Sequence, residues 1–205
     1  MYIPEEYNIS DLKELQSIIK KHSFGIIFSQ FGNKPFATHL PFILNEAKGE
    51  LGLLTTHMAK KNLQWKKWNE ETEVLVVFQG ANFYVSPAWY KNQETVPTWN
   101  YSAVHVYGKP KIINDQSKVR QSLYELMGYH ESNILEKWDI DKAEPIIDKL
   151  INEIIAFEIV ITKIEGKNKF SQDKSSEERA SVLNHVLKYY PKMGNDIKRI
   201  MKTGK

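Results

Sequence analysis

The first residues that could do chemistry lie close together between Thr55 and Trp65. They follow a predicted strand and open a short helix predicted over 58–68, and they offer hydroxyls, an imidazole, ammonium groups and amides: Thr55, Thr56, His57, Lys60, Lys61, Asn62 and Gln64. A helix N-terminus favours negative charge, because its free N–H groups and its dipole point there. These residue types therefore suit a phosphate monoester. The residues alone leave a second interpretation open, a capped helix with exposed lysines.

Two further segments combine aromatic or basic side chains with polar ones. Val96–Tyr101 reads Val-Pro-Thr-Trp-Asn-Tyr and follows Trp89 and Tyr90. Such a mixture suits a flat ligand that is stacked on a ring and hydrogen-bonded at its edge, although an aromatic corner at a barrel end or dimer interface has the same pattern. Lys167–Gln172 either brings a cation and hydrogen-bonding groups to a ligand or forms the polar end of a hairpin.

The elements that must position these segments are mostly strands. Apolar and β-branched runs bounded by turn residues predict strands over 24–30, 35–44, 50–55, 73–79, 82–86, 99–113 and 156–165. Helices are predicted over 10–22, 115–128 and 141–155, after a capping box at Ser175 and Glu178, and from Asn195. Successive strands joined by short turns predict a mainly β fold with flanking helices, built on an antiparallel sheet or barrel.

Composition excludes several kinds of chemistry. The chain of 205 residues has no cysteine, so disulfides, thiolate catalysis and cysteine-ligated metals are ruled out. It also lacks the G-x-G-x-x-G dinucleotide fingerprint, H-E-x-x-H and G-x-S-x-G. His39, His57 and His105 lie in or beside predicted strands, but separate hydrogen-bonded histidines are the commoner arrangement, and no metal is predicted. No catalytic acid, base or nucleophile stands out.

The charge is concentrated at the C-terminal end. The net charge is +3, and residues 188–205 carry six basic residues and one acidic residue: Lys188, Lys192, Lys198, Arg199, Lys202, Lys205 and Asp196. Such a tail can attract nucleic acid, but no helix-turn-helix pattern accompanies it, and a solvated helix end explains it equally. The longest apolar runs have about five residues, too short to span a bilayer, and the N-terminal segment lacks an apolar core, so we expect no signal peptide. We therefore expect a cytoplasmic protein.

A set of motifs along nearly the whole chain resembles one family. The motifs are Met1–Pro4, Ala37–Pro41, His57–Trp65, Phe78–Gly80, Tyr84–Tyr90, Val96–His105 and Lys169–Gln172. The Val-Pro-Thr-Trp-Asn-Tyr and Ser-Pro-x-Trp-Tyr blocks are together specific. On these residues the sequence resembles the FMN-binding negative transcriptional regulators of the PaiB type, in the pyridoxamine-phosphate-oxidase-like flavin split-barrel superfamily.

The resemblance implies a fold, a cofactor and a set of binding residues. The fold would be an antiparallel split β-barrel over 1–172 with inserted helices near 115–155, followed by a helical extension over 173–205. FMN would lie across a homodimer interface. Lys60 would pair with its phosphate, Asn62 and Gln64 would donate hydrogen bonds, and the other expected cofactor-binding residues are Thr38, His39, Thr56, His57, Thr98, Trp99, Asn100, Lys169, Ser171 and Gln172.

The chain departs from the family pattern at three places. Thr56 stands where the family has glycine, and it adds a hydroxyl and a Cβ where glycine lets backbone approach closely. Leu63 replaces a proline, and Asp173 replaces an asparagine and adds negative charge. Three functions remain open: a flavin-binding transcriptional repressor that contacts DNA directly or acts through partners, a flavin-dependent oxidoreductase, and a cofactor-binding dimer without catalysis.

Overall fold

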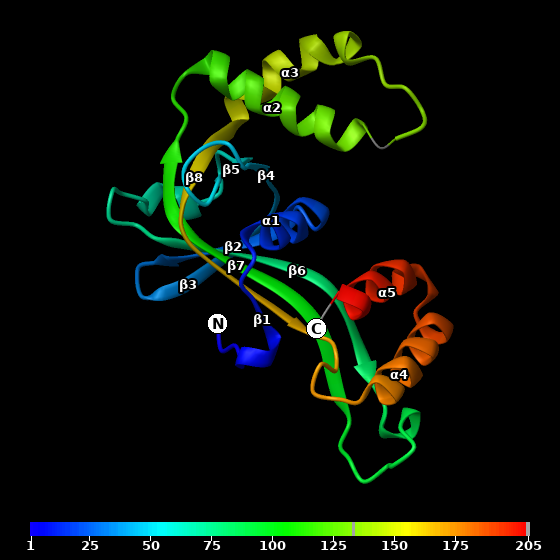
Figure 1. The fold of residues 1–205 in the computed structure, drawn as a ribbon. Coiled ribbons are helices and arrows are strands. Elements are labelled where there is room, and N and C mark those ends of the chain that lie inside the picture. Colours follow the sequence, from blue (N-terminus) through cyan, green and yellow to red (C-terminus); the bar gives the residue numbers. More distant parts are fainter. Residues whose placement is uncertain (133, 204–205) are drawn as a thin grey trace. The chain divides into compact units, whose positions relative to one another are not determined.

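The computed structural model describes residues 1–132 and 134–203, and Figure 1 shows its elements in chain order. The strands are β1 Asn8–Ile9, β2 Phe24–Phe31, β3 Lys34–Pro41, β4 Ile43–Asn45, β5 Leu53–Ala59, β6 Val74–Val85, β7 Thr98–Ile112 and β8 Ile154–Lys169. The α-helices are α1 Leu12–Lys21, α2 Gln116–Glu131, α3 Glu144–Leu150, α4 Ser176–Tyr189 and α5 Gly194–Thr203. Of the predicted basic tail, Lys205 and the side chains of Arg199 and Lys202 lie outside the description.

The strands form one sheet in the order β3-β2-β6-β7-β8-β5-β4, and β1 pairs with β8. The pairs β1–β8, β2–β3, β2–β6, β4–β5 and β5–β8 are antiparallel. The β2–β3 hairpin closes at Phe31 and Lys34 around the predicted turn, where Gly32 has a φ of 62°. A glycine is suited to this turn because it adopts positive φ without a Cβ clash.

Two contact units divide the chain, and each has its own core. Unit 1 comprises Met1–Leu15, Gln79–Val104 and Glu165–Lys205, and unit 2 comprises Gln16–Phe78 and His105–Ile164. In unit 1, Phe83 and Phe170 pack with Val182, Val186 and Ile197 of the last two helices. In unit 2 the fully buried side chains include Phe42, Phe78, Phe157, Leu54 and Ile159. Burying one such side chain stabilises the fold by about 1.5–3 kcal/mol.

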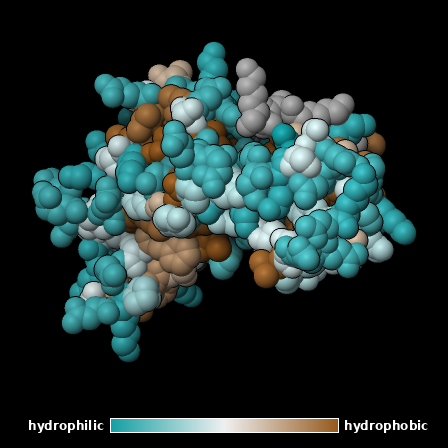
Figure 2. Space-filling model, turned by 60° about the horizontal axis from the view of Figure 1, so that its bottom comes forward, coloured by the Kyte–Doolittle hydropathy of each residue, from teal (hydrophilic) through white to brown (hydrophobic). Residues whose placement is uncertain are grey.

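The part of the surface that Figure 2 shows is mainly polar. The face drawn in Figure 2 is mainly hydrophilic, with hydrophobic residues showing through in separate patches. No helix among the described residues is both long and apolar enough to cross a bilayer.

The predicted helix over 58–68 is wrong. β5 continues to Ala59, which pairs with Ile154 of β8, and the helical part of the described residues 58–68 is the short 3-10 helix η2, Gln64–Lys67. Strand pairing across about 95 residues outweighs the local helical pattern here. A phosphate site based on a helix N-terminus is therefore absent from this segment.

Gly80 and Gly128 do not end a strand or a helix, contrary to the prediction from the sequence. The sequence predicts that Gly80 separates two strands, but β6 runs through it, and a Cβ there would come within 2.9 Å of the Ser102 Cβ on β7. It also predicts that Gly128 ends a helix, but α2 continues to Glu131. The starts of α2 and α4 are predicted correctly: Asp115 accepts hydrogen bonds from Ser117 N and Lys118 N, and Ser175 with Glu178 forms the capping box of α4. The helix predicted over 141–155 is shorter, because α3 spans Glu144–Leu150 and β8 begins at Ile154.

We expect Gly108→Ala to lower the free energy of unfolding by about 2 kcal/mol. Gly108 lies in β7, and an added Cβ would clash with the carbonyl oxygen of Val160 and lie 2.6 Å from Ile159 Cγ2. Gly128→Ala is the matched control, because its Cβ would meet no atom and alanine favours a helix by up to about 1 kcal/mol. Urea denaturation measures both. Equal effects of the two substitutions would contradict the close approach at Gly108.

Candidate functional site

In unit 2 the structure joins Thr38, Asn62 and Gln64 in one buried network. Thr38 Oγ1 donates to Gln64 Oε1 at 2.6 Å, and Asn62 Nδ2 donates to Thr38 Oγ1 at 2.9 Å. Gln64 Nε2 donates to the carbonyl of Ile27 at 3.2 Å and to Ser29 Oγ at 3.1 Å. Gln64 has 0% of its surface exposed. Its amide is therefore occupied in fixing η2 against β2 and β3.

The two expected residues on β5 face opposite ways. Thr56 is buried and its Oγ1 donates to the carbonyl of Pro41 at 2.6 Å. The hydroxyl that distinguishes this chain from the family pattern thus ties β5 to the end of β3. His57 is half-buried on the other face, and burial lowers its pKa because the charged imidazole loses hydration. Burial therefore favours the neutral form of the His57 imidazole.

His39 lies apart from the Thr38 network. It points to the opposite face of β3, is exposed, and stacks on Phe24 with ring centroids 6.3 Å apart. Alternation along a strand separates neighbours in this way. His39, His57 and His105 are not gathered into a metal site, and the described residues contain no group of three or more ligating side chains able to hold a metal ion.

The lysines around η2 form a group of exposed cations in unit 2. Lys60 N donates to the carbonyl of Glu153 at 2.7 Å, and Lys60 Nζ donates to the carbonyl of Asn152 at 3.3 Å. Lys61, Lys66 and Lys67 are exposed as well. None of the four lysines makes an ion pair with a described residue. Their charge is free to attract an anion such as a phosphate group.

In unit 1 the two polar segments predicted from the sequence meet. Lys169 Nζ donates to Thr98 Oγ1 at 2.5 Å, and Asn100 Nδ2 donates to Ser171 Oγ at 2.9 Å. Asn100 is fully buried, and its Oδ1 has no hydrogen-bond partner among the described residues. This juxtaposition joins β7 to the end of β8.

A tight turn follows β8 at Ser171. Ser171 has a φ of 61°, a left-handed conformation that is uncommon for a residue with a side chain. Gln172 stabilises the turn, because its Oε1 accepts from Phe170 N at 2.6 Å and its Nε2 donates to the Asn168 carbonyl at 2.5 Å. The Gln172 amide is thus used within the protein.

Trp99 presents an aromatic surface to solvent. It points to the opposite side of β7 from Thr98 and Asn100 and is 55% exposed. Tyr84 of β6 lies edge-on to it, with ring centroids 6.1 Å apart and planes 71° apart. The pair leaves a ring available for stacking a flat ligand. Tyr84 is not among the predicted site residues, although it lies in Tyr84–Tyr90, one of the motifs that carry the family resemblance.

Lys167 lies in the candidate segment Lys167–Gln172 but is not among the expected cofactor-binding residues. It is buried, and its Nζ lies over the rings of Tyr2, Tyr7 and Tyr101 at 5.6, 5.8 and 5.3 Å from their centroids. Such cation–π contacts stabilise a desolvated ammonium group. The sequence gives no sign of this cage, because its tyrosines come from segments far apart in the chain.

The negative charge of Asp173 is compensated locally. Burial by itself raises the pKa of Asp173, but the hydrogen bond and the charge of Lys174, whose Nζ is 2.9 Å from Asp173 Oδ2, outweigh burial and lower that pKa. Burial, followed by the charge of Asp173, raises the pKa of Tyr7 to about 12. The negative charge that aspartate brings in place of asparagine is therefore paired with the ammonium group of Lys174.

Each unit offers side chains whose chemistry suits one part of a flavin nucleotide. A phosphate requires cations, which unit 2 offers at Lys60 and Lys61, and a flat ring requires an exposed aromatic face, which unit 1 offers at Trp99. Lys169 and Thr98 add an ammonium group and a hydroxyl. When bound, FMN supplies redox chemistry, and the protein supplies orientation and electrostatics.

Solved structures with the same fold include flavoproteins. One is titled "Structure of the FAD and Heme binding protein from Mycobacterium smegmatis", with a TM-score of 0.60, 12% identity, and coverage of 85% of this chain and 79% of that one. Another is the flavocytochrome Anf3 from Azotobacter vinelandii, with a TM-score of 0.60, 14% identity, and coverage of 85% and 75%. The fold is that of the flavin split-barrel proteins, mainly β and antiparallel with flanking helices.

Within that class, sequence comparison shows the family. A family model described as "Putative FMN-binding domain" matches residues 1–163. The "Protease synthase and sporulation protein PAI 2" of Bacillus subtilis (strain 168) is 33% identical over 189 residues, covering 91% of this chain and 89% of that protein. The chain belongs to this PaiB-type FMN-binding family, and FMN is its cofactor. The predicted family, fold class and cofactor are confirmed.

Proposed function

We propose that two copies of this chain bind FMN at their shared interface and that the complex represses transcription. The observation that carries flavin binding is the exposed Trp99 ring beside Tyr84, in the Val-Pro-Thr-Trp-Asn-Tyr segment. Within unit 1, Trp99 and Thr98 would lie against the ring system, with Lys169 and Ser171 supplied by either subunit. Asn100 and Gln172 would act by holding these residues in position.

Within unit 2, we assign the phosphate to the lysines that begin the segment after β5. Lys60 is the first choice, because its ammonium group is exposed and is held only by a carbonyl oxygen at 3.3 Å. Thr38, Asn62, Gln64 and Thr56 would support this segment through the bonds that they already make. His39 and His57 are on the outer strand faces and would lie against the ribityl chain or the ring.

The proposed dimer is supported by an apolar outer face in unit 2. Strand pairing aligns His39, Ile26 and Val77 in one row across β3, β2 and β6, and Ala37, Phe28 and Leu75 in another. Ile26, Val77, Phe28 and Leu75 are only partly buried, and His39 and Ala37 are exposed. A sheet face with so many apolar residues is expected to be covered by another surface, and a second copy is the proposed cover.

The visible spectrum of the purified protein tests cofactor binding, and mass analysis identifies what is released. A yellow protein that releases FMN, or a colourless one that binds added FMN with one site per chain, is the expected result. Sedimentation measures the mass in parallel. A colourless protein that does not bind added FMN, or a protein that binds FMN as a monomer, would overturn the proposed interface site.

We expect Lys60→Ala to raise the dissociation constant of FMN about 10-fold, because a charge-assisted contact with phosphate is worth about 1.5–3 kcal/mol. Lys48→Ala is the matched control: Lys48 is exposed, and its Nζ lies 3.8 Å from Glu158 Oε1. Fluorescence titration with FMN measures both. Equal affinities for the two variants would remove Lys60 from the phosphate site.

Repression is proposed from the family and the basic C-terminal segment. Deleting residues 188–205 would be a poor test, because Ile197 and Met201 are buried in the core of unit 1. Lys192→Gln with Lys198→Gln removes two exposed charges and leaves that core intact. Direct binding predicts a salt-dependent mobility shift on promoter DNA that weakens in this variant. No shift at low salt would rule out direct contact.

The alternative function is a flavin-dependent oxidoreductase without direct DNA binding. Its support is that Trp99 is open to solvent, so a second flat molecule could approach this surface. Turnover of reduced nicotinamide with a quinone or oxygen would favour this function. We also propose a cytoplasmic location, which the absence of cysteine favours, and a division at about residue 172 between the barrel and its helical extension.

A further inference from the structure

A large cleft lies within unit 2 and shares no lining residue with the expected cofactor site. Its volume is about 860 Å³. Clefts that bind small ligands usually have volumes of about 300–1,000 Å³. The cleft is therefore large enough for a ligand of its own.

One wall of the cleft is a polar side of α2. Four polar residues of this helix line the cleft: Lys118, Gln121, Ser122 and Glu125. Their i, i+3, i+4 and i+7 spacing puts them on one side of the helix. The apolar Val119 is instead buried in a hydrophobic cluster with residues that come just before and within β8. A helix that turns polar rather than apolar side chains toward a cleft suits a polar ligand.

Another part of the lining comes from neighbouring strands. Thr55 of β5 pairs with Ile43 of β4 and with Glu158 of β8, and all three line the cleft. Paired residues on adjacent strands lie side by side on the same face of the sheet. They therefore form a row of an apolar group, a hydroxyl and a carboxylate, and Ile113 adds a second apolar side chain. Such a lining can contact small apolar side chains and hydrogen-bond to peptide groups.

The end of the cleft near the start of α2 carries an excess positive charge. Lys111 and Lys118 both line the cleft, and neither forms an ion pair within residues 1–132 and 134–203. The neighbouring acid, Asp115, caps the helix, and its Oδ1 accepts from Ser117 N at 2.8 Å. Because Asp115 offsets only one of the two ammonium groups, this end favours an anionic group on the ligand.

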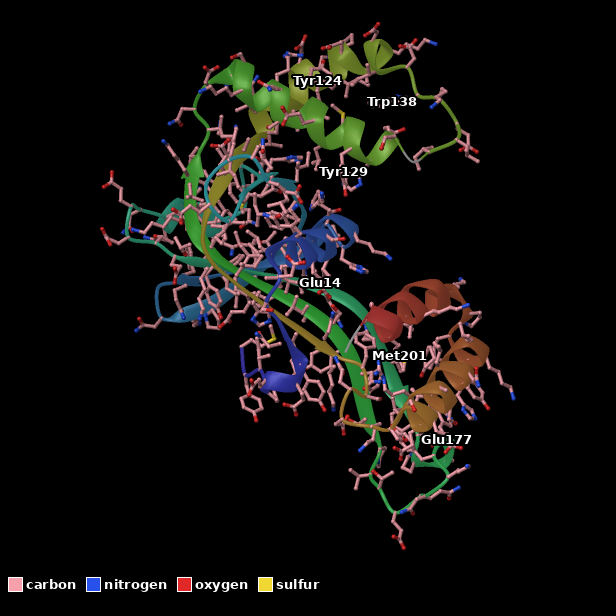
Figure 3. All side chains as sticks on the ribbon, in the orientation of Figure 1. Glu14, Tyr124, Tyr129, Trp138, Glu177 and Met201 are labelled. Atoms are coloured by element: carbon pink, nitrogen blue, oxygen red, sulfur yellow. The ribbon has the colours of Figure 1, made fainter. Side chains whose placement is uncertain are left out.

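The other end of the cleft carries an excess negative charge. Tyr129 Oη donates to the carbonyl of Lys20 at 2.5 Å, so the C-terminal half of α2 lies beside the end of α1 (Figure 3). Lys20 is paired with Glu46 at 2.9 Å. Glu125, one helical turn before Tyr129, forms no ion pair with a described residue, and its Oε1 accepts from Gln121 Nε2 at 2.8 Å. The Glu125 carboxylate therefore favours a cationic group on the ligand.

The spacing of these charges sets the length of the ligand. Lys118 and Glu125 are seven residues apart in α2, which is about 10 Å along the helix axis. Three extended residues span at most about 11 Å. A peptide of this length has a carboxylate at one end and an ammonium group at the other. A single amino acid is too short to place its two charged groups at both ends of the cleft.

We propose that this cleft binds a short peptide of about three residues by its two charged termini. The peptide carboxylate lies at Lys111 and Lys118, and the peptide ammonium group lies at Glu125. Thr55 and Gln121 are placed to hydrogen-bond to the peptide backbone between them. The inference goes beyond the proposed function and does not depend on flavin binding.

Calorimetric titration of the full chain with tri-alanine tests the proposal. One tri-alanine per chain is expected to bind. Acetylating its amino end, or amidating its carboxyl end, is expected to weaken binding about 5-fold, because each change removes one charge contact. These measurements use the unchanged protein, so they do not depend on the folding of any variant. No binding up to about 10 mM tri-alanine, or equal binding of the free and blocked peptides, would overturn the proposal.

Two sets of substitutions assign the ends of the peptide. Lys111→Gln with Lys118→Gln is expected to bind tri-alanine and its amide equally, because the contact that the amide lacks is then missing in both. Glu125→Gln is expected to bind tri-alanine and its acetyl derivative equally, for the same reason. Each set should keep its preference for the free group at the other end. The opposite assignment, or loss of both preferences from one folded variant, counts against the proposed contacts and overturns them.

The matched controls are exposed residues of unit 2 that do not line the cleft: Lys34→Gln with Lys109→Gln, and Glu131→Gln. They should leave both preferences unchanged, and circular dichroism reports the folding of every variant. FMN titration with and without tri-alanine is expected to give the same dissociation constant. Displacement of tri-alanine by FMN would place the flavin in this cleft and overturn a separate peptide site. A protein that binds tri-alanine but not FMN would contradict the proposed function alone.

Discussion

Gln64→Leu is expected to lower the free energy of unfolding by about 3–5 kcal/mol. The substitution keeps a side chain of similar size but removes the amide that joins η2 to β2 and β3. Thr38 Oγ1 loses its acceptor at 2.6 Å, and the Ile27 carbonyl loses a donor at 3.2 Å. Polar groups left unpaired in buried surroundings are costly, because they have given up water without gaining a partner.

Gln121→Leu is the matched control for this prediction. Gln121 is exposed on α2 and its Nε2 donates to Glu125 Oε1 at 2.8 Å, a surface i, i+4 contact. Such a pair contributes about 0.2–0.5 kcal/mol. Urea denaturation of both variants gives the comparison. A loss below about 1 kcal/mol for Gln64→Leu would mean that the network around Gln64 does not hold this part of the sheet.

Trp99→Ala is expected to raise the dissociation constant of FMN roughly 10–100-fold. Stacking of a flat ring on an aromatic side chain contributes about 1–3 kcal/mol. Trp99 is more than half exposed, so its removal opens no core cavity and the folded protein should remain stable. Fluorescence titration with FMN measures the affinity, and urea denaturation checks the stability.

Two further variants serve as controls for the effect of Trp99→Ala on FMN affinity. Trp99→Phe keeps a ring and is expected to retain most of the affinity. Val96→Ala alters an exposed apolar residue that closely precedes β7 and carries no ring, so it should change the dissociation constant less than about 2-fold. Equal binding by Trp99→Ala and the unchanged protein would exclude Trp99 from the flavin site.

Local interactions account for the parts of the fold that are predicted correctly. Asp115 and the Ser175–Glu178 capping box bond to backbone within three residues, so their effect can be read from neighbouring letters. The turn at Gly32 is equally local. The prediction for the segment after β5 is wrong because Ala59 pairs with Ile154, a partner that a local pattern does not reveal.

The two glycines that were predicted to end an element also show that contacts between distant segments can outweigh local preference. Gly80 and Gly128 have the residue type that commonly ends an element, yet β6 and α2 continue through them. At Gly80 the cause is the close approach of Ser102 on the neighbouring strand. A conformational preference is a property of one residue, whereas close packing is a property of two segments.

The sequence by itself determined the chemistry available to this protein: its family, its flavin cofactor, its lack of thiols, and the segments that carry cations, amides and aromatic rings. Only the tertiary structure decided how those side chains are used. Strand alternation turns Trp99 outward and Asn100 inward although they are adjacent, and burial commits the Gln64 amide to the carbonyl of Ile27. The physical reason is that residue type fixes which bonds a group can form, while pairing between distant segments fixes which of those bonds are already made.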